Sequence, residues 1–223
     1  MANNVYTTIE FTEINDAAYS RLIEMSGRIR TGENHNWFSD IFVEGSLTYD
    51  DTMLYSWTTE NLGTKWCYIE DIECGFDIEN PYIRTCSAWS PPIEGVELLL
   101  EYLTKLDPNM ITSVTYEDEM PNFMGWCVYK GDELIDSCQD EADDIRNGIF
   151  AQHPNLAEGW DDEEEDWLET EEGEQASDLY NDVLYEWISE EQSEGIADTL
   201  RYISGWEPNG VFWSEENEPL VPK

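Results

Sequence analysis

The chain has 223 residues, with 51 acidic side chains against 10 basic ones and a formal net charge of −41. Soluble domains usually carry a net charge of about 2 to 8 in magnitude, so this charge excludes nucleic acid and anionic membranes as direct partners. Hydrophobic residues are 40% of the chain and aromatic residues 13%, which is enough apolar surface for a folded core. We therefore expect a folded polyanion whose acidic surface meets a basic partner.

The first part of the chain alternates strand patterns with two helical patterns. Runs of β-branched and aromatic residues between turn residues predict strands at Asn4–Ile14, Trp37–Val43, Leu47–Thr58, Cys67–Ile72, Tyr82–Ala88, Ile111–Tyr116, Phe123–Lys130 and Leu134–Cys138, the second and third forming a hairpin. Apolar residues at helical spacing predict helices at Asp16–Arg30, begun by Asn15 or Asp16, and at Pro91–Leu106, with Ser90 as N-cap. This order predicts an α+β fold, an antiparallel sheet of four or five strands with helices on one face.

The chain changes character near residue 140. Helices are predicted at Asp140–His153 and Ser177–Gly205, on either side of an acid run. The longer helix has one apolar stripe, made of Leu179, Tyr180, Val183, Leu184, Trp187 and Ile188. Ser177 can cap this helix, and Gly195 either breaks it or separates it from a second helix. We divide the chain into an α+β domain at 1–138 and an acidic, mainly helical extension at 139–223, packed on or beside that domain.

Two motifs lie on either side of the predicted strands at 67–72 and 82–88: NLGTKW at Asn61–Trp66 and SAWSPP at Ser87–Pro92. Together with later residues they resemble the YubB-like ferredoxin-like domain family of phage and plasmid proteins. The matching residues are Trp57, Asn61, Gly63, Thr64, Lys65, Trp66, Ala88, Trp89, Ser90, Pro91, Pro92, Tyr116, Glu117, Phe123 and Gly125. Ser87 stands where the family usually has threonine, and Cys86 where an acid is common. The resemblance covers about 1–138, implies a phage context, and implies no catalytic residues.

The motif residues have structural interpretations that we prefer to functional ones. We expect Trp89 to fill the core, Ser90 to cap a helix whose entry Pro91 and Pro92 fix, and Gly63 to form a turn. We expect Lys65 to pair with one of the many carboxylates. The alternatives are a loop that presents Trp89 to a ligand, and a Lys65 that contacts a substrate phosphate.

No pattern in the chain predicts an enzyme, a metal site or a cofactor. The two histidines, His35 and His153, have no Cys or His neighbour at metal-ligand spacing, and no nucleotide-binding or nucleophile motif is present. The five cysteines include no C-x-x-C pair, which is typical of reduced thiols in a cytosolic protein. No stretch is apolar enough for a signal peptide or a membrane span.

The acidic residues gather in the last third of the chain. Residues 151–223 contain 22 acids and only 2 bases, and residues 158–174 alone contain eleven acids. The candidate partner-binding residues are Asp161, Asp162, Glu163, Glu164, Glu165, Asp166, Glu169, Glu171, Glu172, Asp178, Asp182, Glu186 and Glu190. The last four repeat every four residues, although like charges at this spacing destabilise a helix by a few tenths of a kcal/mol per pair. Aromatic residues in the acid run, Trp160 and Trp167, together with Leu168, predict that it is at least partly ordered.

We interpret this pattern as a phage-type DNA mimic whose anionic surface binds and inhibits a basic, nucleic-acid-binding host protein in the host-cell cytoplasm. The candidate targets are a defence nuclease, a CRISPR effector, RNA polymerase or a nucleoid protein. The alternative is an acidic phage assembly protein that docks on a basic virion surface. Two plainer interpretations of the charge are a solvated helix face and adaptation to high salt, although the uneven distribution of acids argues against salt adaptation.

Overall fold

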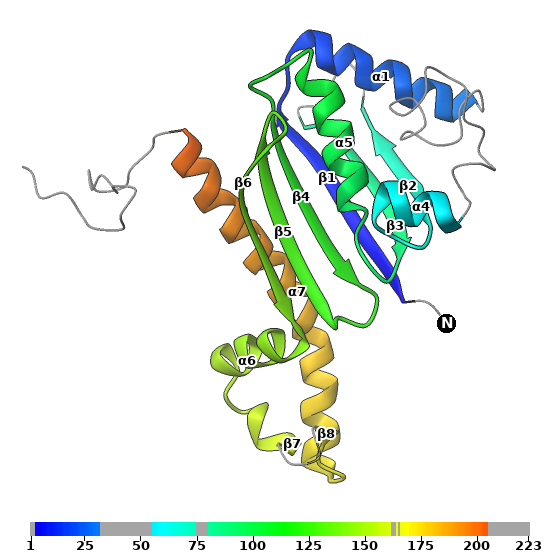
Figure 1. Cartoon of the computed structure of the whole chain (residues 1–223). Coiled ribbons are helices and arrows are strands. Elements are labelled where there is room, and N and C mark those ends of the chain that lie inside the picture. Colours follow the sequence, from blue (N-terminus) through cyan, green and yellow to red (C-terminus); the bar gives the residue numbers. More distant parts are fainter. Residues whose placement is uncertain (1–2, 32–54, 75–79, 162–163, 165, 205–223) are drawn as a thin grey trace, which may run out of the picture.

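The computed structural model describes residues 3–31, 55–74, 80–161, 164 and 166–204 (Figure 1). Its centre is a six-stranded antiparallel sheet in the order β2-β3-β1-β4-β5-β6. The strands are β1 (Asn4–Glu13), β2 (Cys67–Glu73), β3 (Tyr82–Ala88), β4 (Ile111–Asp118), β5 (Phe123–Lys130) and β6 (Glu133–Glu141). The order β2-β3-β1-β4, with helices between β1 and β2 and between β3 and β4, is the ferredoxin-like arrangement that the sequence predicts, and β5 and β6 widen it.

Three helices cover one face of this sheet, and they are α1 (Asp16–Thr31), α4 (Tyr55–Leu62) and α5 (Ile93–Thr104). Alternate residues of β1, among them Val5, Ile9 and Phe11, are fully buried beneath this layer. α5 contributes its predicted apolar stripe to the same core, including Val96 and Leu103, each with no exposed surface. The burial of two complementary apolar faces holds the layers together, at about 25 cal/mol per Å² of apolar surface.

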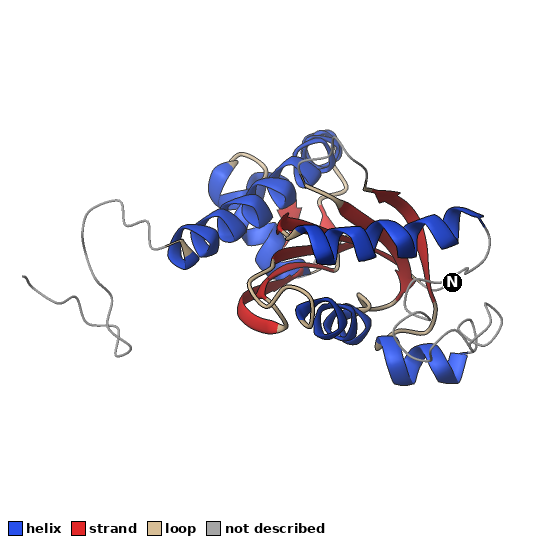
Figure 2. Ribbon diagram, turned by 90° about the horizontal axis from the view of Figure 1, so that it is seen from above, coloured by secondary structure: helices blue, strands red, loops and turns tan. Residues whose placement is uncertain are grey.

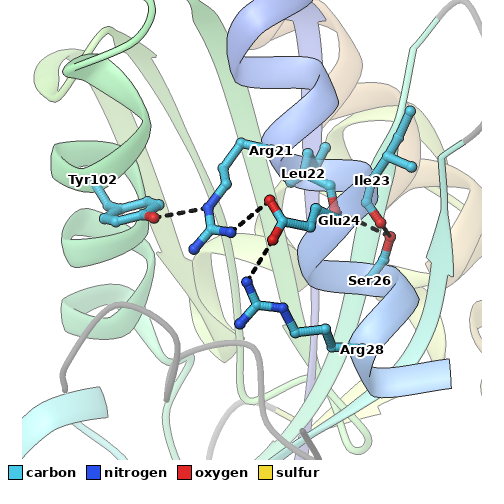
Figure 3. A network of polar contacts seen from close by, with 7 residues as sticks. All are labelled: Arg21, Leu22, Ile23, Glu24, Ser26, Arg28 and Tyr102. Carbon is cyan, nitrogen blue, oxygen red and sulfur yellow. Dashed lines mark hydrogen bonds and ion pairs between the residues drawn. The ribbon is translucent and has the colours of Figure 1, made fainter. Parts of the chain in front are cut away.

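Local capping and ion pairs fix α1. The side chain of Asn15 accepts hydrogen bonds from the backbone N–H groups of the first turn of α1, so Asn15 is the N-cap. Arg21 Nε donates to Tyr102 Oη of α5 at 2.8 Å, and Glu24 receives ion pairs from both Arg21 and Arg28 (Figure 3). The hydrogen bonds from Arg28 and Arg21 lower the pKa of Glu24. Two of the few bases in the chain are therefore engaged within α1.

One strand prediction is wrong where it can be checked. The predicted strand Leu47–Thr58 overlaps the start of α4, and the rest of the predicted hairpin lies outside the described residues. The aromatic and β-branched residues of this segment match a strand pattern, but Thr58 and Leu62, four residues apart, are the positions that become fully buried. Thr58 Oγ1 also donates to the carbonyl of Lys65 at 2.6 Å, which fixes the helix against the following loop.

The last helix of the described chain crosses the other face of the sheet, and the elements before it in the C-terminal part lie beyond one end of β5 and β6 (Figures 1 and 2). Its elements are α6 (Ala142–Gln152), a 3₁₀ turn (Ala157–Gly159), the two short strands β7 (Trp160–Asp161) and β8 (Asp166–Trp167), and α7 (Glu171–Ile203). α7 packs on the side chains of β5 that point away from α1 and α5, among them Met124 and Trp126. No helix within the described residues combines the length and apolar character needed to cross a membrane.

Candidate binding surface

α7 begins earlier than the sequence suggests. Thr170 is its N-cap, because the hydroxyl of Thr170 accepts a hydrogen bond from the backbone N–H of Gly173 at 3.1 Å. Ser177, the predicted cap, instead lies inside the helix. Glu171 and Glu172 fall in the first turn, where carboxylates interact favourably with the positive end of the helix dipole. These two acids therefore also stabilise the helix that carries them.

α7 is anchored along most of its length by its predicted apolar stripe. Leu184, Trp187 and Ile188 are 5%, 6% and 0% exposed, while Leu179 at the outer edge of the stripe is 41% exposed. Farther along, the side-chain amide of Gln192 donates to the backbone carbonyls of Tyr116 and Gly125, both at 3.1 Å. Because these carbonyls belong to β4 and β5, the helix is tied to the sheet by polar as well as apolar contacts.

Gly195 neither breaks α7 nor separates it from a second helix, contrary to the sequence interpretation. The helix is continuous from Glu171 to Ile203, and Gly195 lies directly against Trp126 of β5. A Cβ atom at this position would lie 2.4 Å from the indole of Trp126. The glycine is therefore needed for close packing, and the flexibility that suggested a break has no role here.

The four acids at four-residue spacing, Asp178, Asp182, Glu186 and Glu190, are all exposed on α7. Because α7 begins at Glu171 and continues through Gly195 to Ile203, the same spacing extends at both ends. The complete series, which we call the acid ladder, consists of Glu174, Asp178, Asp182, Glu186, Glu190, Glu194 and Asp198, all exposed. At a rise of about 1.5 Å per residue the ladder is about 36 Å long, and each step turns about 40° around the helix axis in a right-handed sense. The sequence interpretation missed three of the seven members. Glu174 lies before the predicted start of the helix at Ser177, and Glu194 and Asp198 lie next to and beyond the expected interruption at Gly195.

The bases of the chain do little to neutralise this surface. Every ion pair among the described residues joins side chains three or four positions apart on one helix, such as Arg146 with Asp143 and Arg201 with Asp198. Within the described part of the chain, Asp198 is the one ladder member that has such a partner. The other ladder carboxylates therefore face solvent with their charge unbalanced.

The acid run forms a small hairpin that aromatic rings attach to the helices. Trp160 pairs with Trp167 across β7 and β8, and their rings meet edge to face at 5.3 Å. Phe150 of α6 contacts both rings at 6.1 to 6.3 Å, and Tyr180 of α7 lies 5.4 Å from the ring of Trp167. The predicted anchors Trp160 and Trp167 thus hold both strands of the hairpin.

The predicted site residues of this run lie at different places on the hairpin. Glu164, Asp166 and Glu169 are exposed, whereas Asp161 is half-buried. The backbone N–H of Glu164 donates to a carboxylate oxygen of Asp161 at 3.3 Å, which closes the turn. The remaining three, Asp162, Glu163 and Glu165, lie outside the described residues.

A second group of acids lies between β6 and α7. Burial and the neighbouring Asp144 raise the pKa of Asp140, and burial together with Glu194, Asp140 and Glu190 raises the pKa of Glu191. The sequence interpretation did not include Asp140 or Glu191, because only the packing of α7 beside β6 brings them together. Within the described residues, no group of three or more His, Cys, Asp or Glu side chains has the geometry of a metal site.

The family-motif residues form a hydrogen-bonded loop. Three of them, Trp89, Lys65 and Ser90, have roles other than the predicted ones. Trp89 does not fill the core but is 53% exposed, with a left-handed φ of 71°. Lys65 Nζ lies 4.4 Å from the centre of its ring, a cation–π contact in place of the expected carboxylate pair. Ser90 is not a helix cap, because its hydroxyl donates to the carbonyl of Gly63 at 2.8 Å, and the N-cap position of α5 is Pro92.

The rest of this loop explains why Trp89 is forced outward. Gly63 has a φ of 71°, and a Cβ there would meet the carboxylate of Glu94. Thr64 Oγ1 donates to the carbonyl of Ala88 at 2.6 Å, which pins the end of β3. Pro91 and Pro92 follow directly and lead into α5, as expected, while Trp66 stacks on Tyr68 at 5.6 Å.

Fold and surface together define a class: an α+β protein with a ferredoxin-like sheet, and with a docked C-terminal helix that carries a continuous series of acids. No family model matches the chain, and neither the curated proteins nor the solved structures contain a match to it. The resemblance to the YubB-like family therefore stays a prediction from the motifs.

Proposed function

We propose that this protein is a phage-type DNA mimic: its acidic surface occupies the nucleic-acid cleft of a basic host protein and thereby inhibits it. One observation carries the proposal, the acid ladder of seven exposed carboxylates on a helix anchored to the sheet by Leu184, Trp187 and Ile188. A polyanionic tail without such anchoring would lose conformational entropy on binding, whereas a docked helix has already lost it.

The spacing of the ladder supports recognition by a surface built for phosphates. One DNA strand places a phosphate every 3.4 Å or so along its axis, and the ladder places a carboxylate about every 6 Å. The ladder therefore matches a stretch of DNA strand in the sign of its charge, in length and in its right-handed turn. It does not match the density of charge along the strand. The acids of the hairpin and those between β6 and α7 add further negative charge near the ladder. Such a field steers a basic partner and makes the association salt-dependent.

The experiment compares a ladder variant with a matched control. The ladder variant replaces Asp178, Asp182, Glu186 and Glu190 with Asn or Gln. The control replaces four exposed acids elsewhere with Gln, namely Glu13, Glu60, Glu97 and Glu101. Both variants change the net charge equally, so a difference between them reports position and not total charge.

We expect the tagged wild-type protein to capture a nucleic-acid-binding protein from host lysate, identified by mass spectrometry. DNA should compete for the captured protein, and the ladder variant should bind it about ten- to a hundredfold more weakly, because exposed charge pairs contribute roughly 0.2–1 kcal/mol each. The control variant should retain most of the affinity. Equal binding by the ladder variant, or no competition by DNA, would contradict the proposal. Capture of a virion protein would favour the assembly alternative.

A further inference from the structure

α7 covers only part of its face of the sheet and leaves a groove beside it. The groove lies between α7 and strands β1, β3 and β4, with a cavity volume of about 300 Å³. Its lining is Tyr6, Thr8, Arg84, Thr115, Tyr116, Glu117, Tyr185, Ser189 and Gln192. A second cavity of about 360 Å³ continues along α7 over Thr8, Ser113 and Ser193. The floor is therefore a row of short polar side chains with aromatic rings at one end and Glu10, which accepts a hydrogen bond from Asn80, at the other.

Glu117 is the partly buried acidic side chain that lines this groove. It lies on β4 directly beside Tyr6 of β1 in the sheet register and points to the same face as α7. Burial raises the pKa of its carboxyl above the usual range, so the ionised form is poorly solvated. Among the described residues no Lys, Arg or His forms an ion pair with it. A desolvated carboxylate without a cation is stabilised when a cation arrives.

The basic side chain in the groove, Arg84, does not supply this cation. Its guanidinium lies over the ring of Tyr82, 5.0 Å from the ring centre, on the side of the groove toward β2. Asp71, opposite Arg84 across the sheet, accepts a hydrogen bond from Tyr82 at 3.1 Å. Arg84 is thus held over its own aromatic partner at the rim of the cavity.

Two tyrosines stand beside Glu117. Tyr6 is 39% exposed on β1 and Tyr185 is 52% exposed on α7, where its hydroxyl donates to the carbonyl of Glu119 at 3.5 Å. Aromatic faces attract cations, and the planar guanidinium of arginine stacks on them while it donates two parallel hydrogen bonds to a carboxylate. Lysine offers a single, strongly hydrated charge and fits such a site less well.

We infer that this groove receives an arginine side chain of the basic partner, with the Glu117 carboxylate as its acceptor and Tyr6 and Tyr185 as its walls. The inference deepens the proposed function, on which it rests for the identity of the partner. It assigns the partner one anchoring contact in addition to the distributed charge of the acid ladder. The hydroxyls of Thr8, Thr115 and Ser189 then line the path of the chain that carries the arginine.

The groove itself can be tested with a small probe on the full-length protein. N-acetyl-arginine amide is titrated while amide and side-chain resonances are followed by NMR, with N-acetyl-lysine amide and the neutral N-acetyl-citrulline amide as comparisons. We expect the arginine probe to shift resonances of Tyr6, Glu117 and Ser189, and to bind more tightly than either comparison. Citrulline that binds as well as arginine, or shifts that occur elsewhere, would overturn the inference.

Two variants separate the groove from general charge. Glu117→Gln keeps the shape and should weaken the arginine probe about tenfold or more, because a hydrogen bond to a charged group is lost. Glu97→Gln removes the same charge from an exposed site on α5, on the other face of the sheet, and should leave probe binding unchanged. Equal loss in both variants, or no loss in Glu117→Gln, overturns the inference.

The captured partner then distinguishes this inference from the proposed function. If the ladder variant loses the partner and DNA competes, but Glu117→Gln binds the partner as wild type does, the groove inference fails and DNA mimicry stands. If the arginine probe binds through Glu117 but DNA does not compete for the partner, mimicry fails and the groove stands as a cation site. Supporting both ideas requires that Glu117→Gln also weakens the partner about tenfold.

Discussion

Gly195 should determine whether α7 can lie close to the sheet. A Cβ atom added there would lie 2.4, 2.5 and 2.6 Å from Cε2, Cζ2 and Nε1 of Trp126. Attractive contact between such atoms requires about 3.5–4.0 Å. Trp126 is only 9% exposed and lies between β5 and α7, so its ring has no open space to move into. We therefore expect Gly195→Ala to push α7 away from β5.

Two effects of opposite sign set the size of the change. Replacing glycine with alanine inside a helix stabilises it by about 0.8–1 kcal/mol. The required displacement of about 1 Å is a small-to-large change in a packed core, which costs roughly 1–3 kcal/mol. Because three ring atoms of Trp126 would lie within 2.6 Å of the new Cβ, we place the cost in the upper part of this range. After the helix gain is subtracted, the free energy of unfolding should fall by about 1 to 2 kcal/mol. For a chain of this size the midpoint of thermal unfolding should fall by about 2 to 8 °C.

Gly27 provides a matched control in the same protein. It also lies inside a helix, α1, but a Cβ at this position would meet nothing within 4 Å. Gly27→Ala should therefore show the helix gain alone and raise the midpoint by about 2 to 4 °C. Thermal unfolding followed by circular dichroism, and amide exchange along α7, measure both variants under identical conditions.

An unchanged or raised midpoint for Gly195→Ala would refute this reasoning, because it would mean that α7 does not press on Trp126. A double-mutant cycle tests the cause directly. Trp126→Phe removes the indole atoms that the new Cβ meets, so the cost of Gly195→Ala should be smaller in that background. Strict additivity of the two changes would show that the clash is not the source of the effect.

Two further predictions concern α7 and the acids around it. Thr170→Ala removes the N-cap, so it should lower the free energy of unfolding by about 1 kcal/mol and speed amide exchange in the first turn of α7. Thr170→Ser keeps the hydroxyl and should behave nearly as wild type. Equal exchange in both variants would contradict the role of Thr170 as the cap. The raised pKa of Glu191 and Asp140 means that the folded state binds protons more tightly than the unfolded state, so their penalty is present at neutral pH and disappears as the pH falls through the raised values. The midpoint of thermal unfolding should thus gain from these two groups as the pH is lowered from neutral into the range where the carboxyls titrate, and Glu191→Gln should raise the midpoint at neutral pH and reduce this pH dependence. A lower midpoint for Glu191→Gln would count against it.

The sheet was the most predictable part of the fold, because its strands have clear local patterns. β1 alternates in burial along its length, and the face that carries Val5, Thr7, Ile9 and Phe11 is the buried one. β3 and β5 match their predicted bounds, since turn residues border them on both sides. The segment at α4 was misread, since its aromatic and β-branched residues suit a strand and only packing decides for the helix.

The errors at the site have a common physical origin in contacts between distant segments. Gly195 and Trp126 are 69 positions apart in the chain. From the sequence of α7 alone, a glycine at this position therefore suggests a break in the helix. Trp89 is a large aromatic residue of the kind that usually fills a core. The hydrogen bonds of Thr64 and Ser90 turn its backbone outward. The approach of Glu191 to Asp140 likewise depends on how α7 lies beside β6. The four-residue repeat itself needed no tertiary information and was therefore recognised.

The distribution of carboxylates at the borders of the sheet bears on how the protein behaves at high concentration. The two outer strands of the described sheet are β2 and β6, and an outer strand offers unpaired backbone groups to which another chain can add. β6 carries Glu133, Asp136, Asp140 and Glu141, and β2 carries Glu70, Asp71 and Glu73. Two such borders repel each other at neutral pH and low salt, so copies of this chain resist joining strand to strand into fibres. Acid or concentrated salt removes that repulsion and leaves the borders open to strand addition.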